Sequence, residues 1–238
     1  MSVPPAGAPS GGFVLTRWSM VLATADSDQQ QARRALTWLC EAYWQPLVDH
    51  ARYRGMGAHE AQDVVQDFFA RLLEKRDLAA DPLRGRFRSY LIGALNHFLA
   101  NHWDRQRALK RGGGIDTVPL GGPSQELADR RTPEQVFARA WAVTVLERVL
   151  AELEREYQAP KRALLFAALK AALTADGTTQ SHATVGERLG MSEGAIKVAV
   201  HRLRSRYREL LRQEIAQTVS DPADVQAELR ELMEALRA

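Results

Sequence analysis

The stretch TVGERLGMSEGAIKVAVHRLRSRYRELL, residues 184–211, contains the spacing that decides the fold of this chain. Residues 184–189 are expected to form a short helix, and Gly190 then provides a turn position that tolerates positive φ. Ser192 can cap a second helix, because its hydroxyl oxygen can accept a hydrogen bond from a backbone amide of the first turn. The pattern predicts a helix-turn-helix unit.

The second helix of this unit has an apolar side and a basic side. The apolar side chains recur at three- and four-residue spacing and must face the core: Ile196, Val200, Leu203, Tyr207 and Leu210. In such helices, N-terminal side chains reach base edges and later cations meet phosphate. We therefore expect base contacts from Lys197, Val198, His201 and Arg202, and mainly backbone contacts from Arg204, Arg206 and Arg208.

An Arg-rich helix solvated at the surface of a bundle is the alternative interpretation of this segment. The turn at residues 190–192 and the absence of acidic residues between positions 197 and 208 favour DNA. The formal net charge is only +3, but the sequence pI is about 9.2 and the arginines gather in two places. Local clustering of this kind favours a polyanion as the partner.

Composition sets further bounds on the protein. Apolar residues make up 45% and charged residues 26%, which is typical of a folded globular chain. The single cysteine, Cys40, excludes an internal disulfide. The first dozen residues lack the pattern of a signal peptide, and no apolar run is long enough to span a bilayer. We expect a cytoplasmic protein that has no cofactor and does not enter a membrane.

Most of the chain has helical periodicity, which predicts an all-α fold of two small domains joined by a flexible linker. Helices are expected as a hairpin over residues 16–53, at about 59–75 and 88–108, and again from Pro133 with Thr132 as N-cap. The predicted parts are a flexible tail at 1–12, a first domain at 13–111, a Gly- and Pro-rich linker at 112–135, a helix-turn-helix domain at 136–218 and an amphipathic helical extension at 219–238.

The end of the first domain interleaves cations with aromatic rings and amides. Unpaired bases stack on aromatic rings at about 1–3 kcal/mol each while cations hold phosphate, so this mixture favours opened or single-stranded DNA. The alternative, that the aromatics are core residues and the cations are solvated, applies best to Phe87. As a set we assign these residues to DNA: Arg86, Phe87, Arg88, Tyr90, Asn96, His97, Asn101, Trp103, Arg105 and Arg107.

The helix expected over residues 59–75 carries Glu60, Asp63 and Asp67 on the face opposite its apolar stripe. Carboxylates at this spacing could bind a metal ion in a nuclease, with His97 and His102 as further ligands. No second spaced cluster of acids accompanies them, and acids on one helix face are usually solvated or paired with a partner. We therefore expect no metal site and keep a nuclease as the less favoured alternative.

Three motifs in order resemble the extracytoplasmic-function sigma factors of bacterial RNA polymerase. They are QDVVQDFF at residues 62–69, RFRSYL at residues 86–91, and GMSEGAIK with HRLR at residues 190–197 and 201–204. The resemblance covers about residues 30–215. It implies that Asp63, Gln66 and Asp67 contact core RNA polymerase and that residues 86–107 hold the non-template strand of the minus-10 element. The second domain would read the minus-35 element, and the linker would thread towards the polymerase active-site cleft.

The resemblance implies a non-enzymatic initiation factor. Its expected partners are core RNA polymerase and promoter DNA, with an anti-sigma factor or another regulator as a further candidate partner. A stand-alone helix-turn-helix regulator would also explain the C-terminal half, but it leaves the acidic helix and the aromatic segment without a role. The extension at 219–238 opens with Asp221 and Pro222 and carries an apolar stripe: Val225, Leu229, Leu232 and Leu236. We expect this helix to dock on one of the two domains and to modulate promoter access.

Overall fold

The computed structural model describes residues 29–74, 86–112, 131–173, 181–219 and 221–237. These residues form eight α-helices and no strand, with one isolated bridge between Arg86 and Val219. The predicted all-α class is therefore confirmed. The predicted tail at 1–12, the first arm of the predicted hairpin and residues 113–130 of the predicted linker lie outside the described residues.

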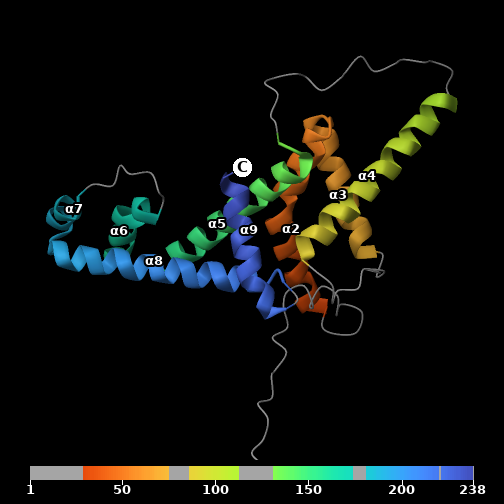
Figure 1. Ribbon diagram of the computed structural model, residues 1–238. Coiled ribbons are helices and arrows are strands. Elements are labelled where there is room, and N and C mark those ends of the chain that lie inside the picture. Colours follow the sequence, from red (N-terminus) through yellow and green to blue (C-terminus); the bar gives the residue numbers. More distant parts are fainter. Residues whose placement is uncertain (1–28, 75–85, 113–130, 174–180, 220, 238) are drawn as a thin grey trace, which may run out of the picture.

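Three helices, α2 (Gln29–Tyr53), α3 (Ala58–Glu74) and α4 (Phe87–Gly112), come first in the described chain (Figure 1). The helix expected over 59–75 is confirmed to within one residue, whereas α4 continues one turn beyond the expected end at residue 108. The apolar stripes of these helices face one another and are buried, among them Leu39, Tyr43 and Leu47 of α2, Val64, Val65, Phe68 and Phe69 of α3, and Phe87, Leu91, Leu95 and Leu99 of α4.

Helix α5 (Pro133–Glu156) connects this core to a second one. Thr132 caps the helix as predicted, and the cap is a full capping box. The amide of Gln135 donates to Oγ1 of Thr132 at 3.3 Å, and the amide of Thr132 donates to Oε1 of Gln135 at 2.7 Å. At 24 residues the helix is about 36 Å long. Its first half, including Trp141, packs in the core of α2, and its second half, including Leu153, packs in the other core.

The second core is built by α6 (Pro160–Leu169), the 3₁₀ turn η2 (Lys170–Leu173), α7 (His182–Leu189) and α8 (Glu193–Ala216). Figure 1 places α6, α7 and the start of α8 at one end of the molecule and α3 and α4 at the other. Ile196, Val200 and Leu203 of α8 are buried against this core, as their spacing predicts. The far end of α8 reaches the first core, where Ile215 is fully buried.

The C-terminal extension forms a 3₁₀ turn, η3 (Pro222–Asp224), followed by α9 (Val225–Arg237). Helix α9 contacts α5 and α8, and Leu232 is fully buried in the first core. At its end, Nη1 of Arg139 on α5 donates to the carbonyl oxygen of Leu236 at 2.9 Å. The helix docks as expected, but on parts of both predicted domains rather than on one, because it contacts α5 and α8 and also pairs with Arg86 and Arg88. An effect on promoter access stays a prediction. Among the residues described, no helix has the length and apolar character needed to cross a membrane.

Candidate nucleic-acid interface

The turn between α7 and α8 is held by local backbone geometry. Gly190 adopts the left-handed conformation at φ 65°, its amide bonds to the carbonyl of Glu187, and the amide of Met191 bonds to the carbonyl of Gly186 at 2.9 Å. This pair of bonds is the Schellman pattern that ends helices. Ser192 then caps α8, with its Oγ accepting from the amide of Ala195 at 3.2 Å. The predicted roles of Gly190 and Ser192 are confirmed.

Gly186 is a second glycine that this turn requires, although no spacing or motif in the sequence marks it. A Cβ at this position would lie 2.5 Å from the carbonyl oxygen of Met191, which is backbone and cannot rotate away. The absence of a side chain therefore lets α7 approach the start of α8. By contrast, a Cβ on Gly194 would meet nothing within 4 Å.

The N-terminal half of α8 presents the predicted base-reading side chains to solvent. Lys197, Val198, His201 and Arg202 are all exposed, opposite the buried stripe of the same helix. Lys197 makes a surface ion pair with Glu193 one turn earlier, at 2.7 Å. Exposed pairs of this kind contribute about 0–1 kcal/mol and exchange readily. This half of α8 is therefore an accessible surface that can meet a ligand without rearrangement.

The later arginines of α8 divide into two groups. Arg204 donates to the carbonyl oxygen of Ala172 through Nε at 2.9 Å and Nη2 at 2.8 Å, so that it joins α8 to η2. Arg206 binds both carboxylate oxygens of Glu156 on α5, with the shortest contact at 2.6 Å, and also pairs with Glu209. Arg208 is exposed and bonds only to the carbonyl of Arg204 among the contacts described.

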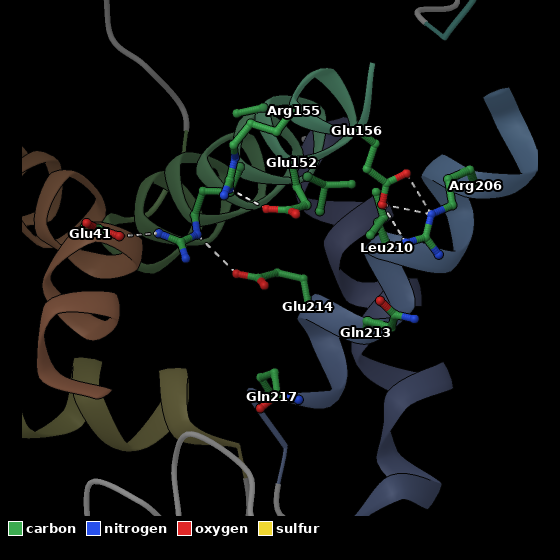
Figure 2. A pocket seen from close by; sticks show the side chains of 12 residues that line it. Glu41, Glu152, Arg155, Glu156, Arg206, Leu210, Gln213, Glu214 and Gln217 are labelled. Atoms are coloured by element: carbon green, nitrogen blue, oxygen red, sulfur yellow. Dashed lines mark hydrogen bonds and ion pairs between the residues drawn. The ribbon is translucent and has the colours of Figure 1, made fainter. Parts of the chain in front are cut away.

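Arg206 faces a polar cleft of about 580 Å³ between α2, α5 and α8, as Figure 2 shows. The hydrogen bond from Arg206 holds the pKa of Glu156 below its ordinary value. Across the same cleft Arg148 bridges Glu41 of α2 and Glu214 of α8, at 3.2 and 3.1 Å. The side chains that line the cleft thus join three helices to one another.

The aromatic residues of α4 differ in how much of each ring solvent can reach. Phe87 is only 2% exposed and packs edge-on against Tyr43, with ring centroids 5.2 Å apart. It is a core residue, as the alternative interpretation held, and its ring is closed to a base in this conformation. Tyr90 and Trp103 are half-buried, and the guanidinium of Arg54 lies 5.2 Å from the Trp103 ring.

The polar residues of α4 differ in their contacts. Oδ1 of Asn96 bonds to Nε2 of His50 at 2.8 Å and accepts from Arg54 at 3.3 Å, which ties this amide to α2. The remaining polar residues are exposed or half-buried: His97, Asn101, Arg105 and Arg107. Of these, Arg107 pairs with Asp104 at 2.6 Å on the surface.

Helix α9 covers Arg86, which directly precedes α4, and Arg88 in the first turn of α4. Glu228 is fully buried, and its carboxylate pairs with Nε of Arg86 at 3.0 Å and with Nε of Arg88 at 2.6 Å. Glu231 also pairs with both arginines. The Arg88 guanidinium also lies 4.9 Å from the ring of Trp141. Burial alone would lower the pKa of Arg88, but the hydrogen bonds and charges of Glu228 and Glu231 outweigh it and raise that pKa.

We call this group, Arg86, Arg88, Glu228 and Glu231, the arginine clamp. Sequence reasoning missed it because the two halves are separated by about 140 positions along the chain. One signal was present, since Glu228 falls between Val225 and Leu232 on the apolar stripe of α9. A carboxylate on such a stripe needs a buried partner.

Asp63, Gln66 and Asp67 lie on the exposed face of α3, opposite its buried stripe. Glu60 on the same helix accepts from Gln106 at 3.4 Å and lies 3.8 Å from Nε2 of His102. Within the described parts of the chain, no three His, Cys, Asp or Glu side chains converge closely enough to hold a metal ion. The face is therefore an exposed acidic surface.

Comparison with known proteins relates this chain by sequence to a curated sigma factor. No family model matches the chain, and no solved structure matches it. A curated protein, the ECF RNA polymerase sigma factor ShbA of Streptomyces griseus subsp. griseus, is 30% identical over 162 residues, which cover 68% of this chain and 77% of the relative. With this identity and an all-α fold, the chain belongs to the extracytoplasmic-function family of RNA polymerase sigma factors.

Proposed function

We propose that this protein binds core RNA polymerase in the cytoplasm, recognises the minus-35 and minus-10 promoter elements and promotes DNA opening. Family membership makes it a transcription-initiation factor and not an enzyme, with RNA polymerase and promoter DNA as its general partners. The assignment of each surface to a promoter element or to polymerase rests on the exposure and chemistry of the residues described above.

The observation that carries the proposal is the exposed face of α8. Lys197, Val198, His201 and Arg202 project from the start of a helix whose opposite side is buried, which is the arrangement that enters a major groove. Arg208 can add a phosphate contact. Arg206 would reach phosphate only by leaving Glu156 and Glu209, and Arg204 is exposed but already bound to the carbonyl of Ala172, so we assign both first to holding α8 in place.

Helix α4 is the proposed minus-10 surface. Its exposed and half-buried members combine ring, amide and cation chemistry, which suits an unpaired strand: Tyr90, His97, Asn101, Trp103, Arg105 and Arg107. Arg86 and Arg88 would hold phosphate when their carboxylate partners are displaced. Phe87 and Asn96 are held in the interior contacts of α4, so their contribution is to position this helix.

The acidic face of α3 is the proposed contact with core polymerase. Asp63, Gln66 and Asp67 are exposed on one face and could pair with basic side chains of the enzyme. Asp67→Asn should therefore weaken binding to core polymerase in an equilibrium binding assay. Asp104→Asn removes the same charge from another helix and should leave that affinity unchanged.

Run-off transcription with core polymerase on a library of promoter sequences tests the proposal as a whole. The protein should direct initiation from a subset of templates, and Arg202→Ala should reduce it. A folded protein that stimulates no initiation on any template would contradict the proposal. Tight binding to a duplex operator without polymerase would instead favour a stand-alone regulator.

A further inference from the structure

We infer that α9 is a built-in competitor of the DNA strand, because its Glu228 and Glu231 carboxylates occupy the two guanidinium groups at the start of α4 that would hold phosphate. This inference rests on the proposed function of α4. It assigns the C-terminal extension an autoinhibitory contact, which has to open before Arg86 and Arg88 can take part in strand capture.

The geometry of the arginine clamp matches the chemistry of a phosphate site. Arg88 presents Nε and Nη2 to the two oxygens of Glu228, at 2.6 and 3.1 Å. A guanidinium fork donates two parallel hydrogen bonds to a carboxylate or to a phosphate in the same way. The carboxylates of α9 therefore stand where phosphate oxygens would bind, and one guanidinium fork cannot serve both.

The charges of the clamp balance, so the site attracts no polyanion while α9 is in place. Two arginines face two glutamates, and Glu228 has no exposed surface. The hydrogen bonds and charges of Arg86 and Arg88 keep Glu231 ionised against the effect of burial and lower its pKa. Displacing α9 would convert a neutral patch into one that carries two positive charges.

The packing of α9 beside α4 explains why its carboxylates compete effectively with phosphate. Leu232 is buried in the first core, and the amide of Phe87 donates to the carbonyl of Thr218 at 3.5 Å, just before the extension. The competing carboxylates are thus tethered beside α4 and act at a high effective concentration. Glu231 lies at the rim, with 39% of its side chain exposed, which makes it the position where an incoming strand can begin the exchange.

A charge-removing pair of variants on α9 tests the inference. Glu231→Gln removes one clamp carboxylate, whereas Glu234→Gln removes the same charge at an exposed position of the same helix. The affinity of the full chain for a fluorescein-labelled oligothymidylate is measured by anisotropy. We expect Glu231→Gln to bind on the order of tenfold more tightly, within the range of about 5- to 150-fold typical of coupled sites, and Glu234→Gln to resemble the unaltered protein.

Hydrogen exchange on the unaltered chain gives a second measurement that needs no substitution. Saturating oligothymidylate should accelerate exchange of the α9 amides, because the strand displaces the helix from the clamp. Equal oligonucleotide affinities for the two variants would overturn the inference. Undiminished protection of α9 while the oligonucleotide is bound would also overturn it.

Run-off transcription by the same proteins separates this inference from the proposed function. If the protein initiates transcription but the two variants bind the oligonucleotide equally, the autoinhibitory contact is wrong and the sigma-factor surfaces stand. If Glu231→Gln binds the oligonucleotide more tightly than Glu234→Gln but none of the proteins supports initiation, the inferred competition between α9 and the strand stands and the proposed function is wrong.

Discussion

The two proposed DNA surfaces, on α8 and on α4, differ in what their cations contact. At the start of α8, Lys197 and Arg202 are exposed, and the pair between Lys197 and Glu193 lies on the surface. At the start of α4, Arg86 and Arg88 meet the buried carboxylate of Glu228. Both segments look equally basic in the sequence.

The difference teaches that a cluster of cations predicts a ligand class but not whether the site is accessible. An exposed ion pair contributes about 0–1 kcal/mol and can be exchanged for a phosphate contact. Breaking a buried pair by removing one partner costs about 3–5 kcal/mol, because a charge is left without compensation. The surface on α8 is therefore ready to bind, whereas the start of α4 requires movement of α9.

The largest expected effect comes from loosening the helix that covers α4. Leu232→Ala should lower the free energy of unfolding by about 2–5 kcal/mol, since its fully buried side chain would leave a cavity in the first core. Urea unfolding measures the change. Met233→Ala, at a neighbouring position that is 47% exposed, should stay within about 0.5 kcal/mol. Equal losses in the two variants would contradict the burial of α9.

The turn between α7 and α8, which positions the accessible surface of α8, can be disturbed by a single substitution. Gly186→Ala should lower the free energy of unfolding by about 1–3 kcal/mol, because the new Cβ would press on the carbonyl of Met191 and push α7 from α8. Gly194→Ala makes the same chemical change in open space and should stabilise the protein by about 0.5–1 kcal/mol. Thermal unfolding distinguishes them, and the same sign for both would refute this description of the turn.

Two arginines on α8 together test the proposed base-reading role of this helix. Arg202→Ala should weaken binding of the polymerase complex to a preferred promoter by about 1–3 kcal/mol and relax sequence preference at one position. Arg206→Ala should change promoter affinity less and stability more, because Arg206 is bound to Glu156. Binding titrations at fixed salt measure both, and the reverse order would contradict the assignment.

The smallest expected effect concerns pH. Arg206 lowers the pKa of Glu156 from its ordinary value of 4.5, so this pair stabilises the fold above pH 4.5 and the contribution is lost as pH falls through the lowered pKa. The difference in Tm between Glu156→Gln and the unaltered protein should therefore shrink below pH 4.5. Glu147→Gln, at an exposed position, should show no such trend. A difference that does not depend on pH would rule out the pair as its source.

Much of the fold could be predicted because helices are encoded by neighbouring residues. The cap at Thr132, the turn at Gly190 and the buried stripe of α8 follow from spacings of three or four residues, and each is confirmed. Of the residues assigned to DNA, those on the outer face of α8 are exposed as expected. Phe87 is the clearest exception, since a ring that follows the pattern of stacking residues also fits the stripe of a core.

The sequence by itself determined the helices, the helix-turn-helix and, through three ordered motifs, the family. Only the tertiary structure decided which charges are available: Arg206 faces Glu156 from 50 positions away, and Arg88 faces Glu228 from 140 positions away. The physical reason is that periodicity records which side of a helix is buried, whereas an ion pair depends on which helix is packed against that side. The packing of other helices thus explains why the cations at the start of α8 are exposed whereas those at the start of α4 are covered.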